Sequence, residues 1–220
     1  MAEHSRALAH HFENLEQQRD AGELGMWLFL TTEIMFFGGL FLAYCVFRAW
    51  YPAEFVAGSE TMDVTLGTIN TAVLLTSSLS MALAVRAAGQ SQRRRLVALL
   101  VATTLLGVVF LGIKSYEYHH KYEEGLIPFG GFPFAYDTGR RAGLVTFLNL
   151  YFLMTGLHAF HMVVGIFMLL ALAVLAWRGG LLGERSLPVH NIGLYWHFVD
   201  LVWVYLFPFF YLIAVRSGGH

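Results

Sequence analysis

The chain has few charged residues and almost no cysteine. Charged residues make up 13% of its 220 residues, whereas an ordinary soluble domain carries about 25%. The single cysteine, Cys45, excludes a disulfide framework and thiolate-bound clusters among these residues. The net charge of −1 provides no broad basic surface for nucleic acid. Gly-rich phosphate loops, nucleophile elbows and HExxH motifs are also missing from the sequence.

Apolar residues take the place of the missing charge. They make up 57% of the chain, against about 45–50% in a typical soluble protein. A membrane-spanning helix needs about 20 mostly apolar residues, and none of the apolar runs alternates as a barrel strand would. We therefore predict an all-α integral membrane bundle of five transmembrane helices within residues 26–220. The predicted spans are 26–47, 66–85, 96–113, 144–177 and 192–215.

The first 25 residues form a polar segment with both signs of charge. A secretory signal would begin with a basic region followed by a short apolar core, and this segment has neither. We expect it to be a cytoplasmic tail.

The arginines between the spans predict the orientation. Arg86 and the three arginines at 93–95 lie between the second and third spans, and Arg178 and Arg185 lie between the fourth and fifth. Basic short loops face the cytoplasm, so we expect a cytoplasmic N-terminus and an outer C-terminus. Residues 114–141, whose Gly, Pro and aromatic content predicts an ordered surface loop, then lie outside, although their four basic residues weaken the bias.

Five ionisable side chains fall within the predicted spans. Such residues are rare at membrane depth and mark function or pairing. At about 1.5 Å of rise per residue, all five fall in or near the cytoplasmic half of the bilayer. They are Glu33, His158, His161, His197 and Asp200.

Glu33 lies about a third of the way along the first span. We expect it to avoid lipid and to meet a histidine or another donor from the fourth or fifth span, because an isolated charge at the helix centre costs about 2.5–3.5 kcal/mol on insertion scales. Two interpretations have equal weight. Glu33 is either a neutral acid with one interhelical hydrogen bond, or a residue that handles protons or binds lipid.

Metal binding by these histidines is conceivable but disfavoured. His158, His161 and His197 would have to converge around zinc, copper or haem with a supporting second shell, and hydrogen-bonded packing histidines are the commoner case. Glu117 and His120 have the spacing of di-iron bundles, yet the motif occurs once instead of twice. We predict no metal site and no catalytic centre in this chain.

Several other polar and small residues have mainly structural interpretations. Ala72, Thr76 and Ser80 predict a small-residue face for close helix packing, and we expect Asn70 to hydrogen-bond across helices. Arg86 and Arg178, at the inner boundary, are candidates for binding lipid headgroups; simple orientation charge is the alternative.

Several segments together carry a family resemblance. The chain resembles subunit III of the haem–copper cytochrome c oxidases over residues 22–214, and it looks like the five-helix bacterial form, without the first two helices of the seven-helix form. The segments that carry the resemblance, in order, are "MWLFLTTEIMFFGGLFLAY", "INTAVLLTSSLSMALA", "LGIKSYEY", "FLMTGLHAFHMVVG" and "GLYWHFVDLVWVYLF".

The resemblance implies a non-redox accessory subunit of a proton-pumping terminal oxidase that couples cytochrome c oxidation to oxygen reduction. Such a subunit stabilises the catalytic subunit I, also meets subunit II, binds phospholipid and supports proton uptake in the bacterial cytoplasmic membrane. Haem and copper belong to the partner subunits.

By similarity, Glu33 matches the buried carboxylate of the family, and Arg178 matches a lipid-headgroup arginine. His158, His161, His197 and Asp200 match its polar motif positions. Without the first two helices the lipid cleft of the long form lacks one wall, which puts its lipid contacts in doubt here.

Two alternatives stay open. The same fold could serve a quinol oxidase or a nitric oxide reductase. A stand-alone proton transporter built on Glu33 and the histidines belongs to a different class; transporters often show inverted repeats, and no repeat is visible in these five spans.

Overall fold

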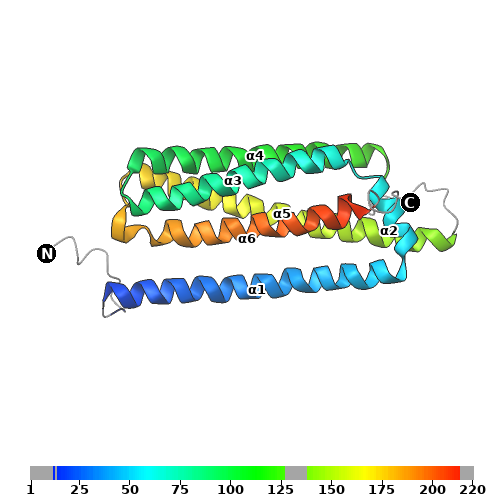
Figure 1. The fold of residues 1–220 in the computed structure, drawn as a ribbon, viewed down its shortest axis with the longest axis horizontal. Coiled ribbons are helices and arrows are strands. Elements are labelled where there is room, and N and C mark those ends of the chain that lie inside the picture. The colour runs from blue at the N-terminus through cyan, green and yellow to red at the C-terminus, as the bar shows by residue number, and fades with distance from the viewer. Residues whose placement is uncertain (1–11, 13, 127–137, 214–220) are drawn as a thin grey trace.

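The computed structural model describes residue 12, residues 14–126 and residues 138–213. These residues contain helices and no β-strand. Five of the helices are long and apolar enough to cross a membrane, so the predicted all-α bundle of a multi-pass membrane protein is confirmed (Figure 1). In chain order the elements are α1 (Leu15–Trp50), α2 (Pro52–Glu60), α3 (Val64–Gly89), α4 (Arg93–Glu123), α5 (Thr138–Trp177), the 3-10 helix η2 (Gly183–Arg185) and α6 (Leu187–Tyr211).

The helices extend beyond the apolar runs that predicted them. α1 begins at Leu15 within the polar N-terminal segment, where the side chain of Asn14 accepts a hydrogen bond from the backbone N–H of Gln17 at 2.7 Å. α4 continues to Glu123, so the first third of the predicted outer loop is helical. Apolar runs mark the part of a helix that lies in hydrocarbon, whereas capping side chains set where the helix ends. Residues 127–137 of that loop lie outside the described part of the chain.

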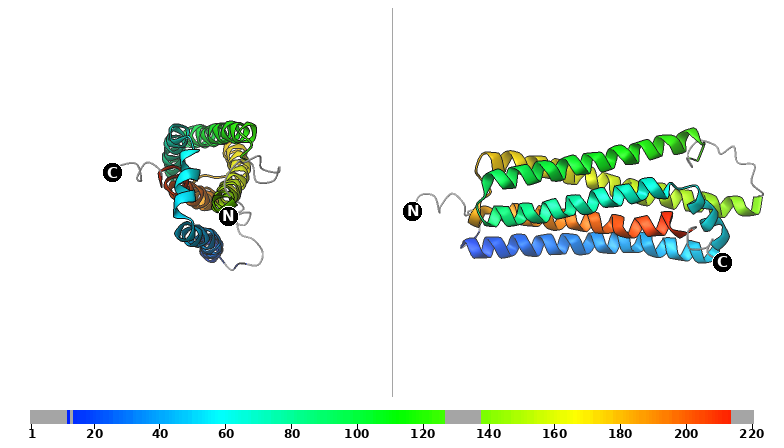
Figure 2. Two further views of the ribbon diagram at one scale, coloured as in Figure 1. Left: turned by 90° about the vertical axis from the view of Figure 1, so that its right-hand side faces the viewer. Right: turned by 45° about the horizontal axis from the view of Figure 1, so that its top comes forward.

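Four helices surround a shared core and α1 lies outside them. Viewed end-on, α3, α4, α5 and α6 occupy the corners of a bundle, with α1 to one side of it (Figure 2). α1 contacts α5 and α6 and connects to the bundle through α2. The start of α1 lies at the same end of the bundle as the α3–α4 and α5–α6 connections (Figure 1). Both arginine-bearing turns are therefore at the N-terminal end.

Trp196 of α6 fills the centre of the four-helix bundle. Its indole N–H donates to the Ser77 hydroxyl of α3 at 3.0 Å. A methyl group added to Gly107 of α4 or to Gly165 of α5 would lie 2.8 or 2.9 Å from the Trp196 ring. Only glycine lets both backbones approach the indole this closely. The Trp196 side chain of α6 therefore contacts α3, α4 and α5 at once.

α1 attaches to the bundle by one narrow stripe. Leu30, Phe37 and Tyr44, spaced seven residues apart, are buried, and the Tyr44 hydroxyl donates to the backbone carbonyl of Phe209. By contrast, Leu28 and Met35 on another side of α1 are 61% and 72% exposed. This face of α1 is left to lipid or to another chain.

The expectations about α3 were wrong for most of their residues. Ala72 and Thr76 are exposed, whereas Ser80 is buried and donates to the Leu99 carbonyl of α4 at 3.2 Å, so Ser80 alone of the three predicted residues packs against another helix of this chain. Close approach occurs instead at Gly67, which packs against the rings of Phe207 and Tyr211. Asn70 is fully buried, yet neither atom of its amide group has a hydrogen-bond partner among the described residues. A small-residue pattern identifies faces that could pack closely, and the global arrangement selects among them.

Candidate functional site

Glu33 and His161 form the one direct contact among the five ionisable residues. The Glu33 Oε2 atom lies 3.1 Å from Nε2 of His161 on α5, and the two side chains are 19% and 13% exposed. Glu33 belongs to the stripe by which α1 contacts the bundle, one turn after Leu30 and one turn before Phe37, whose ring packs edge-on against the imidazole. The carboxyl group therefore points toward α5.

The backbone of α5 restricts how this pair holds protons. The second ring nitrogen of His161, Nδ1, lies 2.8 Å from the carbonyl oxygen of Leu157. A carbonyl oxygen only accepts, so Nδ1 carries a hydrogen. The bond between Nε2 and Glu33 then contains one proton, which belongs either to a neutral carboxyl group or to an imidazolium. In both cases the pair as a whole is neutral, which suits a weakly polar environment.

His158 occupies an aromatic pocket in the bundle. It is 1% exposed, and its ring centroid lies 5.4 Å from that of Phe110 on α4 and 5.4 Å from that of Trp203 on α6. Neither ring nitrogen has a hydrogen-bond partner in the described part of the chain. His158 thus lies one turn from His161 but in different surroundings.

His197 and Asp200 lie on the α3 side of α6. His197 Nδ1 is 2.8 Å from the Ser78 hydroxyl, which also lies near the Asp200 carboxyl group. Asp200 is 4% exposed, and its carboxyl oxygens have no hydrogen-bond partner within residues 14–126 and 138–213. The five predicted residues therefore divide among three surroundings. Within the described residues, no group of three or more His, Cys, Asp or Glu side chains is arranged to hold a metal ion.

A second buried polar site lies toward the opposite end of the bundle. Lys114 and Glu117 of α4, each 3% exposed, form an ion pair of 3.2 Å. Two tyrosine hydroxyls complete it. Tyr151 of α5 lies 2.8 Å from the Lys114 Nζ atom and donates to Glu117 Oε1 at 2.6 Å. Tyr211 of α6 lies 2.6 Å from Nζ and donates to the same oxygen at 2.5 Å. We call these four residues the Lys114 network.

Sequence reasoning missed this network because the predicted third span ended at Ile113. Lys114 and Glu117 were thereby assigned to a surface loop, although their spacing places them on one helix face. The available signal was that Lys114 and Glu117 continue the helical spacing beyond the apolar run that ends at Ile113. The ammonium group also lies 4.8–5.3 Å from the centres of four aromatic rings, those of Tyr118, Tyr151, Trp203 and Tyr211.

Comparison with known proteins identifies the family. The family model for cytochrome c oxidase subunit III matches residues 5–124 and 140–215, which is most of the chain. This chain belongs to the cytochrome c oxidase subunit III family. It is a subunit III of a haem–copper oxidase.

Two relatives show how oxidase subunits of this family are named. Cytochrome bo(3) ubiquinol oxidase subunit 3 of Pseudomonas aeruginosa is 31% identical over 190 residues, covering 86% of this chain and 84% of the relative. The probable quinol oxidase subunit 3 of Staphylococcus aureus is 28% identical over 215 residues, covering 96% of this chain and all of the relative.

Basic side chains gather at the N-terminal end of this subunit III. Arg86 in the last turn of α3 and Arg178 after α5 are both exposed. Gln92 and the arginines at 93–95 line a surface hollow at the start of α4. Exposed guanidinium groups at the end of a membrane bundle can bind lipid phosphate.

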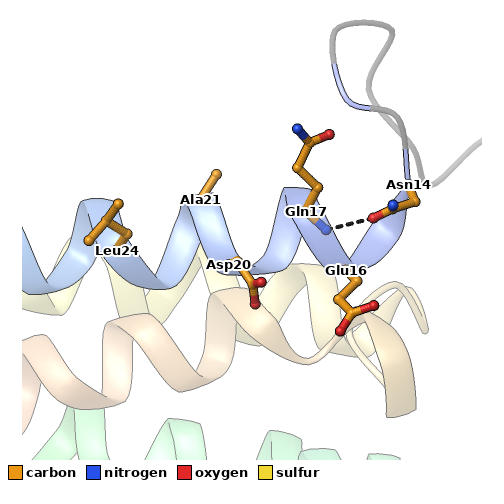
Figure 3. A pocket seen from close by; sticks show the side chains of 6 residues that line it. All are labelled: Asn14, Glu16, Gln17, Asp20, Ala21 and Leu24. Atoms are coloured by element: carbon orange, nitrogen blue, oxygen red, sulfur yellow. Dashed lines mark hydrogen bonds between the residues drawn. The ribbon is translucent and has the colours of Figure 1, made fainter.

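Another hollow lies beside the first three turns of α1, before Glu33. All its lining side chains come from the start of this one helix, and the bond from Gln17 to Asn14 is the helix cap (Figure 3). Because no other helix contributes to this hollow, it is not a candidate for the functional site. The lining residues are Asn14, Glu16, Gln17, Asp20, Ala21 and Leu24.

Proposed function

We propose that this subunit III is a non-redox accessory subunit of a proton-pumping terminal oxidase. It stabilises the catalytic subunit I, also contacts subunit II, and supports proton uptake, while haem and copper reside in those partners. The observation that carries the proposal is the family match over nearly the entire chain. The Lys114 network and the Glu33–His161 pair connect helices of the bundle through polar contacts, which suits a supporting role.

The electron donor of the complex has two candidates. Both relatives described above are named as quinol oxidase subunits, which favours a quinol, whereas the family model is named for cytochrome c oxidase. We take the quinol as the first candidate. This chain touches neither donor in our proposal, so the donor is a property of the complex.

Purification of the intact complex tests both parts. The chain, carrying an affinity tag, is expected to copurify with haem-bearing subunits that show an oxidase spectrum and consume oxygen with a reduced quinol. Oxygen consumption only with reduced cytochrome c would move the donor to the second candidate. Isolation without any haem-bearing partner, together with proton movement by the chain alone in liposomes, would refute the accessory role and favour a transporter.

The Glu33–His161 pair is the proposed link to proton supply. Glu33→Gln keeps a donor facing His161 Nε2 but removes the exchangeable carboxyl proton. We expect normal assembly and reduced turnover under proton-limited conditions, such as weak buffer at alkaline pH. The matched control is Thr32→Ala, because the neighbouring Thr32 hydroxyl is exposed and bonds only within α1, to Phe29. Normal turnover of Glu33→Gln in weak buffer would reduce Glu33 to a packing role.

Lipid binding is proposed at the N-terminal end, which we assign to the cytoplasmic side of the bacterial inner membrane because both arginine-bearing turns lie there. Arg86 and Arg178 are the candidates for phosphate contacts. Replacing both by Gln should reduce the anionic phospholipid retained by the purified complex. Arg48→Gln, an exposed arginine at the other end of α1, is the control. Equal retention in all variants would leave Arg86 and Arg178 as orientation charges.

A further inference from the structure

Tyr195 of α6 contacts both helices that carry the Glu33–His161 pair. Its hydroxyl donates to the backbone carbonyl of His161 on α5 at 2.9 Å. Its ring centroid lies 6.1 Å from that of Phe29 on α1, which is four residues before Glu33 and therefore on the same side of that helix. Tyr195 is only 4% exposed. One buried side chain of α6 thus contacts α5 at His161 and α1 one turn before Glu33.

A glycine of α5 lets Tyr195 come this close. Gly165 is one turn after His161, and a methyl group added to it would lie 3.2 Å from the Cε1 atom of Tyr195. A side chain at position 165 would therefore crowd the tyrosine ring and press it away from α5. Because glycine has no side chain, the ring lies against the helix and its hydroxyl reaches the carbonyl of His161.

The hydrogen bond of Tyr195 goes to the backbone of α5 and not to Glu33. The hydroxyl hydrogen is held by the His161 carbonyl, an atom that only accepts. Tyr195 also lies near Glu33, but the hydrogen bond of the Glu33 carboxyl group within the described residues is the one to the His161 ring. Tyr195 therefore fixes the turn of α5 that carries the imidazole, without taking part in the shared proton.

From these contacts we infer that Tyr195 is a positioning residue of the Glu33–His161 pair and controls the pH at which the pair loses its shared proton. Two titratable groups lie near Glu33 on neighbouring helices, His161 on α5 and Tyr195 on α6. The inference adds a residue to the proton-supply role proposed above and rests on that role for its function in the complex.

The direction of the effect follows from the proton on Nδ1 of His161. That proton bonds to the Leu157 carbonyl, so the neutral ring presents Nε2 to Glu33 as an acceptor. The pair is hydrogen-bonded while it holds the shared proton, and two acceptors face each other once the proton has left. Close contact at 3.1 Å therefore favours keeping the proton. Loosening this contact by removing the Tyr195 hydroxyl should make the pair lose its proton at a lower pH.

Infrared spectroscopy of the intact oxidase complex as a function of pH tests this inference. The signals of the pair are the pH-dependent absorptions that are lost in Glu33→Gln. We expect Tyr195→Phe to lower their midpoint by about 0.4–1 pH unit, the equivalent of one neutral hydrogen bond. Tyr205→Phe is the matched control, because this second tyrosine of α6 also packs against α1, at Phe41, two turns beyond Glu33. It should leave the midpoint unchanged.

A second variant tests the contact with α1. Phe29→Leu keeps the Tyr195 hydroxyl and weakens only the aromatic contact, so it should shift the midpoint in the same direction by a smaller amount. An unchanged midpoint in Tyr195→Phe, or the absence of any pH-dependent signal specific to Glu33, would overturn the inference. A raised midpoint would also overturn it, because Tyr195 would then donate directly to the Glu33 carboxylate.

The midpoint is measured without reference to turnover, which separates this inference from the proposed function. Normal turnover of Glu33→Gln in weak buffer would refute the proton-supply role, while the infrared midpoint would still show whether Tyr195 positions the pair. If both hold, the alkaline limb of turnover in weak buffer should move to lower pH in Tyr195→Phe. The same substitution in the Glu33→Gln background should not move it, and an equal shift in both backgrounds would show that Tyr195 acts elsewhere.

Discussion

Lys114 and Glu117 lie one turn apart on α4 and form an ion pair that is almost completely enclosed by protein, with each residue 3% exposed. Tyrosine hydroxyls from α5 and α6 bond to both members. Burial of two charges is costly unless they are paired and their remaining hydrogen-bonding capacity is met. This arrangement meets both conditions, and in doing so it fixes the relative positions of three helices.

Removing one member of this ion pair should destabilise the subunit more than removing both. Glu117→Gln leaves the Lys114 charge buried without its counter-charge, and breaking a buried pair in this way costs about 3–5 kcal/mol. The double variant Lys114→Met/Glu117→Gln has no unpaired charge and should recover part of the loss. The measurement is the temperature at which subunit III separates from the purified complex.

Ser115→Ala is the matched control for the Lys114 network. It lies between the two charged residues, is exposed, and bonds only to the Leu111 carbonyl of its own helix. It should behave as the unmodified protein. A double variant that is less stable than Glu117→Gln alone would contradict this prediction. It would mean that the contacts between the ammonium group and the tyrosine hydroxyls contribute more stability than the ion pair with Glu117.

The hydrogen bond of Glu33, as distinct from its charge, should hold α1 against α5. The Leu157 carbonyl keeps a proton on Nδ1 of His161, so in the neutral ring Nε2 is an acceptor, and a Gln at position 33 can donate to it. Glu33→Leu cannot, and the partly buried acceptor left unpaired should cost about 1–3 kcal/mol. Thermal retention of subunit III compares the two variants. Equal losses would show that the charge of Glu33 stabilises the contact.

The number of spans could be predicted from the sequence, but the partners of the polar residues within them could not. Five apolar runs were sufficient to predict five helices. The partner of Glu33 depends on where α1 docks, and only the assembled bundle specifies that it meets His161 and not His197. The Lys114 network was not predicted because its charged residues follow the apolar run that ends at Ile113. From the sequence alone, such residues cannot be distinguished from loop residues, since the tyrosines that bond to them belong to α5 and α6.

Glycines in this bundle should respond to alanine according to what lies beside them. A methyl group on Gly165 would lie 2.9 Å from the Trp196 ring, and overpacking of this kind costs about 1–3 kcal/mol. Gly38 on α1 has no atom within 4 Å of the added position, and Gly→Ala in an open helix interior gains about 1 kcal/mol. Thermal denaturation of the purified complex should therefore move in opposite directions for Gly165→Ala and Gly38→Ala. A loss in Gly38→Ala would instead indicate that a helix of another subunit packs closely against α1 at that position.

The attachment of the second half of α1 to the bundle should depend on Tyr44. Its hydroxyl donates to the carbonyl of Phe209, which lies in the last turn of α6, where backbone carbonyls lack partners within the helix. Tyr44→Phe keeps the ring stacked on Phe209 at 5.0 Å and removes only this bond, worth about 0.5–1.5 kcal/mol. Backbone amide hydrogen exchange in the second half of α1 should become about 2- to 10-fold faster in the purified complex, since local opening follows local stability. Tyr205→Phe, which alters a 53% exposed ring on α6, should leave that exchange unchanged. Faster exchange spread equally over α3 and α4 would contradict a local role, because it would mean that Tyr44 stabilises the bundle as a whole.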